Sequence, residues 1–396
     1  MKFRDVLIVL FCSLLIVSLA LHYAFLVKDS TEDEPLEVFV GVDVAYDNMA
    51  EIKRLVDEIS NYTNLFVIGC TGISYNVTQL YETCQYVYEK GFSFIVYSDM
   101  PPFKEWFLCH YFDCADRWGE KFLGLYAFDE GGGRQLDLKI PRPYRVYEAD
   151  NYTDAGNQFV NNVTEGLNWF REGFNSSMNF PFFTSDYALY WFDYKGGYDV
   201  VFAEFGWNYS RPLNVALCRG AATVQNKDWG VMITWTYTEP PYIESGEKLY
   251  EDMVLAYENG AKYIVIFDAN KDYTHGILKE EHLEALKQFW QYIQDNPRTS
   301  DAINDRVAYV LPKDYAYGFR GPNDKIWGLW EADDLSYELC IDLSSLMKQY
   351  GCMNACIQCM LDIIYDDGIN TDTTKAYSKL IFWNGTVYNR TTNLLG

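Results

Sequence analysis

The sequence predicts an α/β protein whose main body is a (β/α)8 barrel, followed by a small α/β domain. Two observations lead to this prediction. From residue 36 onward, short runs of β-branched and aromatic residues alternate with amphipathic stretches that end in Gly or Asn, which is the pattern of βα units. Eight such runs follow one another at a mean spacing of about 32 residues, as expected when eight units occupy about 250 residues.

The eight expected strands are almost continuously apolar, which indicates that both faces of the sheet are buried. Their residues are 38–44, 65–70, 93–99, 122–130, 180–186, 199–207, 230–237 and 262–270. Residues 48–62, 76–91 and 277–293 have apolar side chains at spacings of three and four, and these segments are predicted to be helices of the outer ring. The segment from Gly131 to Asn151 has two Pro, three Gly and little periodicity, and it is predicted to be a long loop after the fourth strand.

A second, smaller domain is expected at the C-terminal end. The 396 residues, of which 49% are hydrophobic, can form one large core and leave about a hundred residues for a second one. After Pro297 the pattern restarts with apolar runs at 306–312, 361–367 and 379–384 and a helical stretch at 335–351. We therefore assign residues 1–35 to an N-terminal segment, 36–298 to the barrel and 299–396 to an α/β domain with a three-strand core. Residues 317–330 are expected to form the interface with the barrel or to reach its mouth.

The N-terminal segment has the pattern of a membrane signal. Lys2 and Arg4 precede an almost unbroken apolar run from Val6 to Val27. At about 1.5 Å per residue this run is long enough to cross about 30 Å of hydrocarbon, with the positive flank on the cytoplasmic side. A cleaved signal peptide is the alternative, because Ser18 and Ala20 form a small-x-small site. Either reading predicts a membrane-anchored or secreted protein whose body lies outside the cytoplasm.

Glycosylation motifs and cysteines agree with that location. Eight Asn-x-Ser/Thr sequons occur, at Asn61, Asn76, Asn151, Asn162, Asn175, Asn208, Asn384 and Asn389. Nine of the ten cysteines lie outside the apolar run, which allows four disulfides and one free thiol in an oxidising compartment. The spacing of Cys352, Cys356 and Cys359 also occurs in iron–sulfur enzymes, but disulfide bonding or burial fits an oxidising compartment better.

Composition argues against several classes of function. The net charge of -24 would repel a phosphate backbone, so nucleic acid is not an expected partner. The four His are too few for an amidohydrolase-type metal barrel, and no H-x-H, H-E-x-x-H, G-x-S-x-G or P-loop motif occurs. No metal and no cofactor is expected.

Carboxylates at the ends of the expected strands are the candidate site residues, because strand ends meet at one mouth in this fold. They are Asp43, Asp47, Asp129, Glu130, Asp186, Glu204, Glu239 and Asp268. Their aromatic neighbours are Tyr46, Tyr126, Trp207, Trp235 and Tyr237. Carboxyl pairs beside aromatic side chains suit cleavage of a glycosidic bond. The alternative is that the same acids have only structural roles. They would then cap helices or form ion pairs with Arg134 or Arg219.

Two segments carry a resemblance to a known enzyme class. LGLYAFDEGGG contains Glu130 and ITWTYTEPP contains Glu239, and together they resemble the glycoside hydrolase type of TIM barrel. That class includes a large clan with an acid/base Glu after strand four and a nucleophilic Glu at strand seven. Here Asp129, not Asn, precedes Glu130, and Glu239 lies several residues beyond the expected strand. The resemblance covers roughly residues 36 to 297.

A third segment offers a competing second carboxylate. FAEFGWN followed by CRGAATVQNKDWG looks like extracellular hydrolase-like barrels that carry a Glu after strand six and an Arg-Gly-Ala-Ala helix. This resemblance implies a role for Glu204. Asp129 is expected to raise the pKa of Glu130 by like-charge proximity, which suits a general acid.

The expected function is therefore glycoside hydrolysis, with Glu130 as the acid/base, Glu204, Glu239 or Asp129 as the partner, and carbohydrate as the substrate. The remaining acids, Asp43, Asp186 and Asp268, and the aromatic neighbours are expected to bind substrate. The alternative is a non-catalytic barrel that binds glycans or belongs to a cell-envelope assembly.

Overall fold

The computed structural model describes residues 36–99, 117–138, 146–173, 180–298, 305–321, 323–352 and 358–390. The predicted membrane segment, Val6 to Val27, lies outside these ranges. Within them, no helix combines the length and the apolar character needed to cross a bilayer. Leu36 and Arg298 belong to a small separate unit, in which the Leu36 N–H donates to the Arg298 carbonyl at 3.0 Å.

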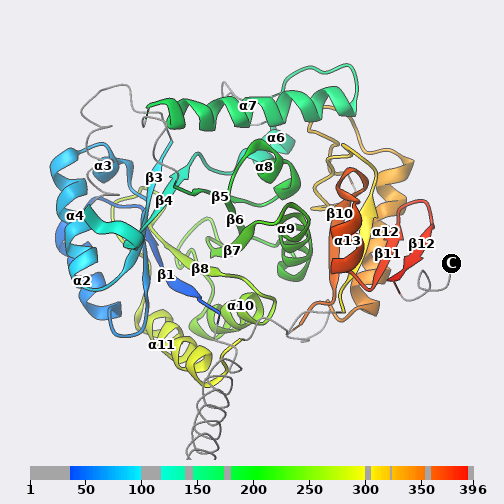
Figure 1. Ribbon diagram of the computed structural model, residues 1–396. Helices are drawn as coiled ribbons and strands as arrows, with labels where there is room; N and C mark the ends of the chain where they lie inside the picture. Colours follow the sequence, from blue (N-terminus) through cyan, green and yellow to red (C-terminus); the bar gives the residue numbers. More distant parts are fainter. Residues whose placement is uncertain are drawn as a thin grey trace, which may run out of the picture. The chain divides into compact units, whose positions relative to one another are not determined.

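Eight parallel strands close into a barrel in sequence order (Figure 1), as the sequence predicts. The strands are β1 (Phe39–Val44), β2 (Leu65–Ile68), β3 (Ser93–Ser98), β4 (Phe122–Ala127), β5 (Phe182–Asp186), β6 (Val200–Phe205), β7 (Asp228–Ile233) and β8 (Tyr263–Asp268). β8 pairs with β1 from Phe39 opposite Tyr263 to Val44 opposite Asp268, which leaves no open edge. Every carboxyl end therefore faces the same mouth.

Helices surround the barrel. They are α2 (Met49–Ile59), α3 (Thr71–Ser74), α4 (Val77–Glu89), α6 (Gly131–Asp137), α7 (Tyr152–Gly173), α8 (Tyr190–Gly196), α9 (Arg211–Gln225), α10 (Gly246–Glu258) and α11 (Glu280–Asp295). Asn48, Asn76 and Ser245 cap α2, α4 and α10 by accepting a backbone N–H with their side chains. The apolar faces of these helices pack on the outward-facing strand residues, as at Val56 and Leu249.

Aromatic side chains fill the barrel interior. Phe39 stacks on Tyr263 with ring centroids 5.1 Å apart, and Phe183 meets Tyr263 edge-on at 5.4 Å. Phe202 completes this layer beside Phe183. Because side chains occupy the interior, the barrel has a packed core, and a ligand can bind at its mouth but not along its axis.

The expected long loop after β4 is wrong in its first part, because Gly131 to Asp137 form helix α6. Two of the three glycines that suggest a loop, Gly132 and Gly133, are needed for close packing instead. A Cβ on Gly132 would lie 2.5 Å from the Ala188 carbonyl oxygen, and one on Gly133 would lie 2.2 Å from the Tyr187 ring. The glycines therefore let α6 approach the β5–α8 connection.

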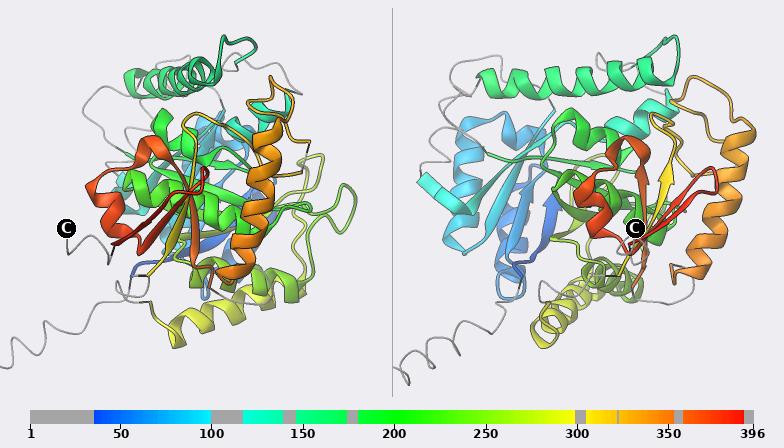
Figure 2. Two further views of the ribbon diagram at one scale, coloured as in Figure 1. Left: turned by 90° about the vertical axis from the view of Figure 1, so that its right-hand side faces the viewer. Right: turned by 45° about the vertical axis from the view of Figure 1, so that its right-hand side comes forward.

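A small mixed sheet follows the barrel. It has the order β10 (Leu361–Tyr365), β9 (Val307–Leu311), β11 (Lys379–Phe382) and β12 (Val387–Asn389). β9 pairs in parallel with β10 and β11, and β12 adds an antiparallel edge strand to the three that the sequence predicts. Figure 2 shows α12 (Asp334–Gln349) and α13 (Thr371–Ala376) on different sides of this sheet.

Helix α9 joins the barrel to the C-terminal sheet, because it lies between the barrel strands and β10 (Figure 1). Buried Arg219 donates from Nε to Asp362 Oδ1 at 2.7 Å, and Arg306 donates to Asp362 Oδ2 at 2.7 Å. The Tyr377 hydroxyl donates to the same oxygen at 2.8 Å. A Cβ on Gly220 would lie 2.4 Å from the Ile363 carbonyl oxygen. The Arg-Gly-Ala-Ala segment thus serves this docking, and Arg219 does not bind a strand-end acid of the barrel.

The segment of residues 317–330 packs on the barrel, as expected for an interface. Arg320 pairs with Asp137 at 2.8 Å, and its guanidinium lies 5.6 Å from the centre of the Tyr187 ring. Trp327 is fully buried against Phe159 and Phe192. Among the described cysteines, Cys352 and Cys359 form a disulfide.

Candidate functional site

A pocket of about 430 Å³ lies at the mouth of the barrel, within the size range of small-molecule sites. The ends of β1, β3, β4 and β8 contribute Asp43, Tyr97, Tyr126 and Phe267 to its wall. The complete lining is Asp43, Ala45, Asp47, Gly69, Cys70, Thr71, Gly72, Tyr97, Asp99, Tyr126, Asp129, Arg134, Phe267 and Tyr273. This is the face at which barrels of this type carry their active sites.

Asp129 lines the pocket and is held by three donors. Its Oδ1 accepts from the Tyr126 hydroxyl at 2.6 Å and from the Ser185 hydroxyl at 2.9 Å. Its Oδ2 accepts from Arg134 at 3.4 Å. These hydrogen bonds hold the Asp129 carboxyl group in one orientation at the wall of the pocket.

Glu204 shares the Ser185 hydroxyl with Asp129. Ser185 Oγ lies 2.8 Å from Glu204 Oε1. A serine hydroxyl has one hydrogen, so it can donate to one of these two acids at a time. Burial, together with the negative charges of Glu130 and Asp129, raises the pKa of Glu204 well above its ordinary value. A protonated Glu204 can then donate to Ser185, which donates to Asp129.

Glu130 has an unusual backbone conformation at the start of α6. Its φ is +51°, and that of Phe128 is +63°, so two non-glycine residues in the left-handed region flank Asp129. Each such residue costs on the order of 1–3 kcal/mol, and strain of this kind clusters at functional sites. The Glu130 N–H donates to the Ser185 carbonyl at 2.9 Å, which fixes this turn against β5.

Arg134 connects Glu130 to Asp129. Its Nε donates to Glu130 Oε2 at 2.6 Å, while its Nη2 reaches Asp129. Burial is the largest cause that raises the pKa of Glu130, to about 7; the negative charge of Asp129 raises it further, and the Arg134 guanidinium opposes both. A carboxyl that exchanges its proton near neutral pH can serve as a general acid and then as a general base.

Asp186 supports α6 and does not line the pocket. Its carboxylate accepts the N–H groups of Gly132, Gly133, Tyr187 and Ala188. Asp193 lies close behind it, fully buried, and its two oxygens accept no hydrogen bond from the described residues. Burial, followed by the charge of Asp186, raises the pKa of Asp193. A protonated Asp193 can donate to Asp186, so this pair fits a structural duty.

Two further acids at the mouth differ in their surroundings. Asp268 accepts the N–H groups of Ile277 and Leu278 and the hydroxyl of Tyr46, so it fixes the connection after β8. Asp43 is 2% exposed, and its Oδ1 has no hydrogen-bond partner among the described residues. Burial raises the pKa of Asp43, and so do the charges of Asp129 and Asp268.

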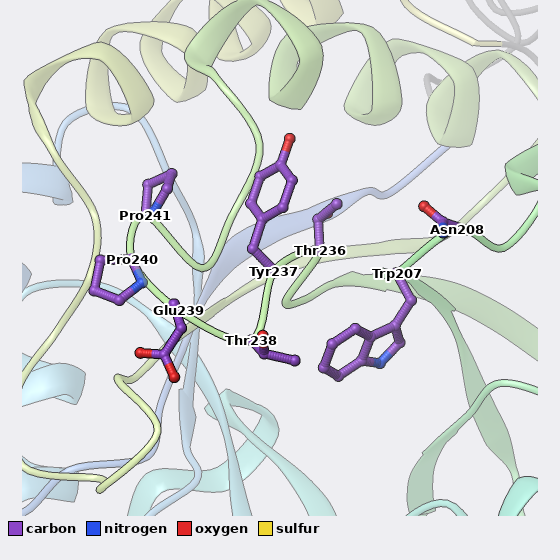
Figure 3. A pocket seen from close by; sticks show the side chains of 8 residues that line it. All are labelled: Trp207, Asn208, Thr236, Tyr237, Thr238, Glu239, Pro240 and Pro241. Atoms are coloured by element: carbon purple, nitrogen blue, oxygen red, sulfur yellow. The ribbon is translucent and has the colours of Figure 1, made fainter.

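The remaining predicted residues line or border a second, open groove, which Figure 3 shows between Trp207 and the loop from Thr236 to Pro241. Glu239 is 72% exposed there and pairs with Lys271. Tyr237 donates its hydroxyl to Glu244. The Trp235 indole donates to the Ala269 carbonyl and packs against Tyr273, next to the groove. The structure thus brings Asp129, Glu130 and Glu204 together and leaves Glu239 apart from their network.

Several site residues are not identifiable from the sequence. Ser185 and Tyr97 have no charge and lie inside apolar runs, so no pattern distinguishes them from core residues. Arg134 is four residues after Glu130, a spacing at which two side chains pair on a helix, but the three glycines between them favour a loop in the sequence. Tyr273 lies in a connection, where only the fold shows that it reaches the pocket.

Other predicted sites can be located in the described residues. Asn61, Asn76, Asn151, Asn208 and Asn384 are exposed, Asn162 and Asn389 are partly buried, and Asn175 lies outside the described ranges. Within those ranges, no group of three His, Cys, Asp or Glu is placed to hold a metal ion.

Comparisons with known proteins give distant structural matches alone. No family model and no curated protein matches the chain. Similar solved structures include an alpha-L-fucosidase from Paenibacillus thiaminolyticus (TM-score 0.48, 10% identity, covering 83% of this chain and 58% of that one). A D-psicose 3-epimerase from Clostridium cellulolyticum H10 has a TM-score of 0.37 at 10% identity, covering 65% of this chain and 98% of that one. A beta-mannanase from Mytilus edulis has a TM-score of 0.39 at 8% identity, covering 64% and 92%. The closed eight-strand sheet is itself a TIM barrel, and these solved structures are distantly similar to it.

Proposed function

We propose that this protein hydrolyses glycosidic bonds at the mouth of its barrel. The observation that carries the proposal is the pair Asp129 and Glu130, which one arginine contacts; Asp129 and this arginine line the pocket, and Glu130 is next to Asp129 in the chain. The Asp129 carboxylate faces three donors, and the pKa of Glu130 is raised to about 7. An anionic carboxylate beside a protonated carboxyl group is the minimum that acid-catalysed glycoside cleavage requires.

Glu130 supplies the proton in the proposed reaction. As the bond between the anomeric carbon and the leaving oxygen breaks, the Glu130 proton moves to that oxygen, and the leaving alcohol departs neutral. Asp129 stabilises the positive charge that develops on the anomeric carbon. Water then adds to that carbon, and its proton returns to Glu130. Each cycle thus consumes one water and regenerates both carboxyl groups.

Ser185 and Glu204 act as positioning residues in this proposal. A proton on Glu204 keeps the Ser185 hydroxyl directed at Asp129, which holds that carboxylate in one orientation. The tyrosines of the wall, Tyr97, Tyr126 and Tyr273, offer flat apolar faces with polar ends, which suit sugar rings. We further propose, from the N-terminal apolar run and the sequons, that the substrate is a glycan outside the cytoplasm.

The test is turnover of a panel of glycans and aryl glycosides by the full-length chain and by Glu130→Gln. Release of sugar that the substitution abolishes, with substrate binding retained, supports the proposal. If neither protein turns over any member of the panel and both retain glycans, the barrel is a glycan-binding module and the proposal is wrong.

A further inference from the structure

The open groove between Trp207 and the loop from Thr236 to Pro241 has the lining of a sugar-binding surface (Figure 3). Its volume is about 630 Å³, and its lining consists of aromatic, proline, hydroxyl and amide side chains with one acid, Glu239. That acid pairs with Lys271 at 3.1 Å, so its charge is compensated. Flat apolar faces beside hydroxyl groups suit an uncharged sugar.

Trp207 is held at this groove by its backbone and not by packing of its ring. Its φ of +46° lies in the left-handed region, which costs on the order of 1–3 kcal/mol for a residue with a side chain. Its N–H donates to the Trp235 carbonyl at 2.8 Å. The Trp207 indole is half-buried and packs on no aromatic ring of the described residues, whereas Trp235 packs on Phe267 and Tyr273. A strained backbone that presents an unstacked indole to a groove indicates a binding surface.

The next residue, Asn208, connects this surface to a glycan. Asn208 is exposed, belongs to the lining of the groove and begins an Asn-x-Ser sequon, and no other sequon asparagine belongs to that lining. Arg211 fixes the turn that carries it. The Arg211 Nη1 donates at 2.9, 3.0 and 2.9 Å to three carbonyls, those of Gly206, Trp207 and Tyr209. A glycan attached to Asn208 would therefore start from a fixed point on the wall of the groove.

The attachment also makes weak binding sufficient. A ligand tethered to the residue beside its binding surface has an effective concentration on the order of millimolar. The groove therefore needs only millimolar affinity for a free sugar in order to hold a tethered one. Figure 3 shows the Trp207 indole directed toward Thr238, so a sugar ring on the indole would have a hydroxyl group close by.

We propose that the groove holds the N-linked glycan of Asn208, with the apolar face of a sugar on the Trp207 indole. The glycan then covers the indole and forms part of the protein surface beside the barrel mouth. This inference goes beyond the proposed function and does not depend on it, because it concerns a glycan of the protein itself and not a substrate.

The test is hydroxyl-radical footprinting of the full-length chain, produced in a host that N-glycosylates exported proteins and analysed by mass spectrometry. Ser210→Ala removes the sequon and leaves every residue of the lining unchanged, and the Ser210 side chain makes no capping hydrogen bond to α9. Ser210→Thr retains the sequon and is the matched control. We expect Trp207 to be oxidised severalfold faster in Ser210→Ala than in the wild type or in Ser210→Thr. Trp169, which is 39% exposed on α7, should be oxidised at one rate in all three proteins.

Four outcomes would overturn the inference. They are an unmodified Asn208 in the glycopeptides of the wild type, equal oxidation of Trp207 in the wild type and Ser210→Ala, and an equal increase in Ser210→Thr. The fourth is protection of Trp207 by a free oligosaccharide in the glycosylated wild type, which would assign the groove to a soluble glycan instead. None of these measurements uses turnover, so failure of the proposed hydrolysis leaves the result unchanged.

Discussion

Arg134 Nε donates a 2.6 Å hydrogen bond to Oε2 of Glu130, one helical turn earlier in the chain. This contact opposes the effect of burial on Glu130, because the guanidinium favours the ionised carboxylate. The ion pair therefore sets the pH at which Glu130 loses its proton.

Arg134→Gln should raise the pKa of Glu130 above its value of about 7. The general acid must be protonated, so activity in the wild type should fall as the pH rises through about 7, and in the variant this fall should come at higher pH. The measurement is the dependence of kcat/KM on pH for both proteins. A fall at the same or a lower pH would show that Arg134 does not control this proton.

Glu130→Gln should lower kcat/KM by about 10²–10⁴-fold, the usual size of general acid catalysis. The loss should be greatest for glycosides with poor leaving groups, because these need the proton most, and the decline near neutral pH should disappear. A series of aryl glycosides with different leaving-group pKa values measures this. Asp372→Asn serves as the surface control.

Glu204→Gln separates a positioning role from a nucleophilic one. The amide can donate to Ser185 as the protonated acid does, so activity should stay within about tenfold of the wild type, whereas Glu204→Ala leaves the hydroxyl without this partner and should lose more. Steady-state kcat and KM of the two variants decide the point. Complete inactivity of Glu204→Gln would identify Glu204 as the attacking carboxylate.

Asp193→Asn should stabilise the protein, increasingly so at higher pH. The pKa of Asp193 is raised in the folded state, so the native protein holds a proton that the unfolded chain releases above its ordinary pKa of about 4. Stability from this group is thus complete at low pH and declines as the pH rises, by up to about 1.4 kcal/mol per pH unit until the folded pKa is reached. Asparagine removes this dependence. Urea unfolding at pH 5 and pH 8 measures it, and equal effects at both would contradict the raised pKa.

Asp362→Asn should destabilise the fold by about 3–5 kcal/mol, the cost of breaking a buried ion pair. Asp362 is fully buried between Arg219 and Arg306, and the substitution leaves both guanidinium groups without their anion. The free energy of unfolding in urea gives the value. A loss below 1 kcal/mol would mean that water molecules hydrate the two guanidinium groups in place of the missing carboxylate.

The barrel was predictable because apolar strands buried on both faces leave an unmistakable pattern in the sequence, as in the run from Tyr263 to Asp268. Edge strand β12 was not predicted, because it has three residues and their side chains are partly or fully exposed. Such a strand has no alternation of buried and exposed residues that the sequence could show. Helix α6 was not predicted because it begins with three glycines. Glycine disfavours a helix by local preference, yet here its missing side chain permits packing against Ala188 and Tyr187, which are distant in sequence.

The candidate site was predictable in part. Charge and strand-end position pointed to Asp129, Glu130 and Glu204, and the structure brings these three together. The same reasoning could not separate them from Asp186 or Asp268, because the backbone N–H groups that those two bind have no signature in the sequence. The arrangement of Ser185 between two acids depends on the closed barrel, which aligns β5 with β4 and β6.

The docking of α9 determines how far this chain can be shortened. In most barrels of this type the outer helices face water, whereas α9 carries a buried arginine and a glycine that touches β10. Cutting the chain after α11 would expose Arg219 and the surface of small residues around it, and would leave them without a counter-charge. We therefore expect the barrel and the C-terminal sheet to unfold in a single cooperative step and to resist proteolytic separation. Any active fragment should extend from β1 through β11.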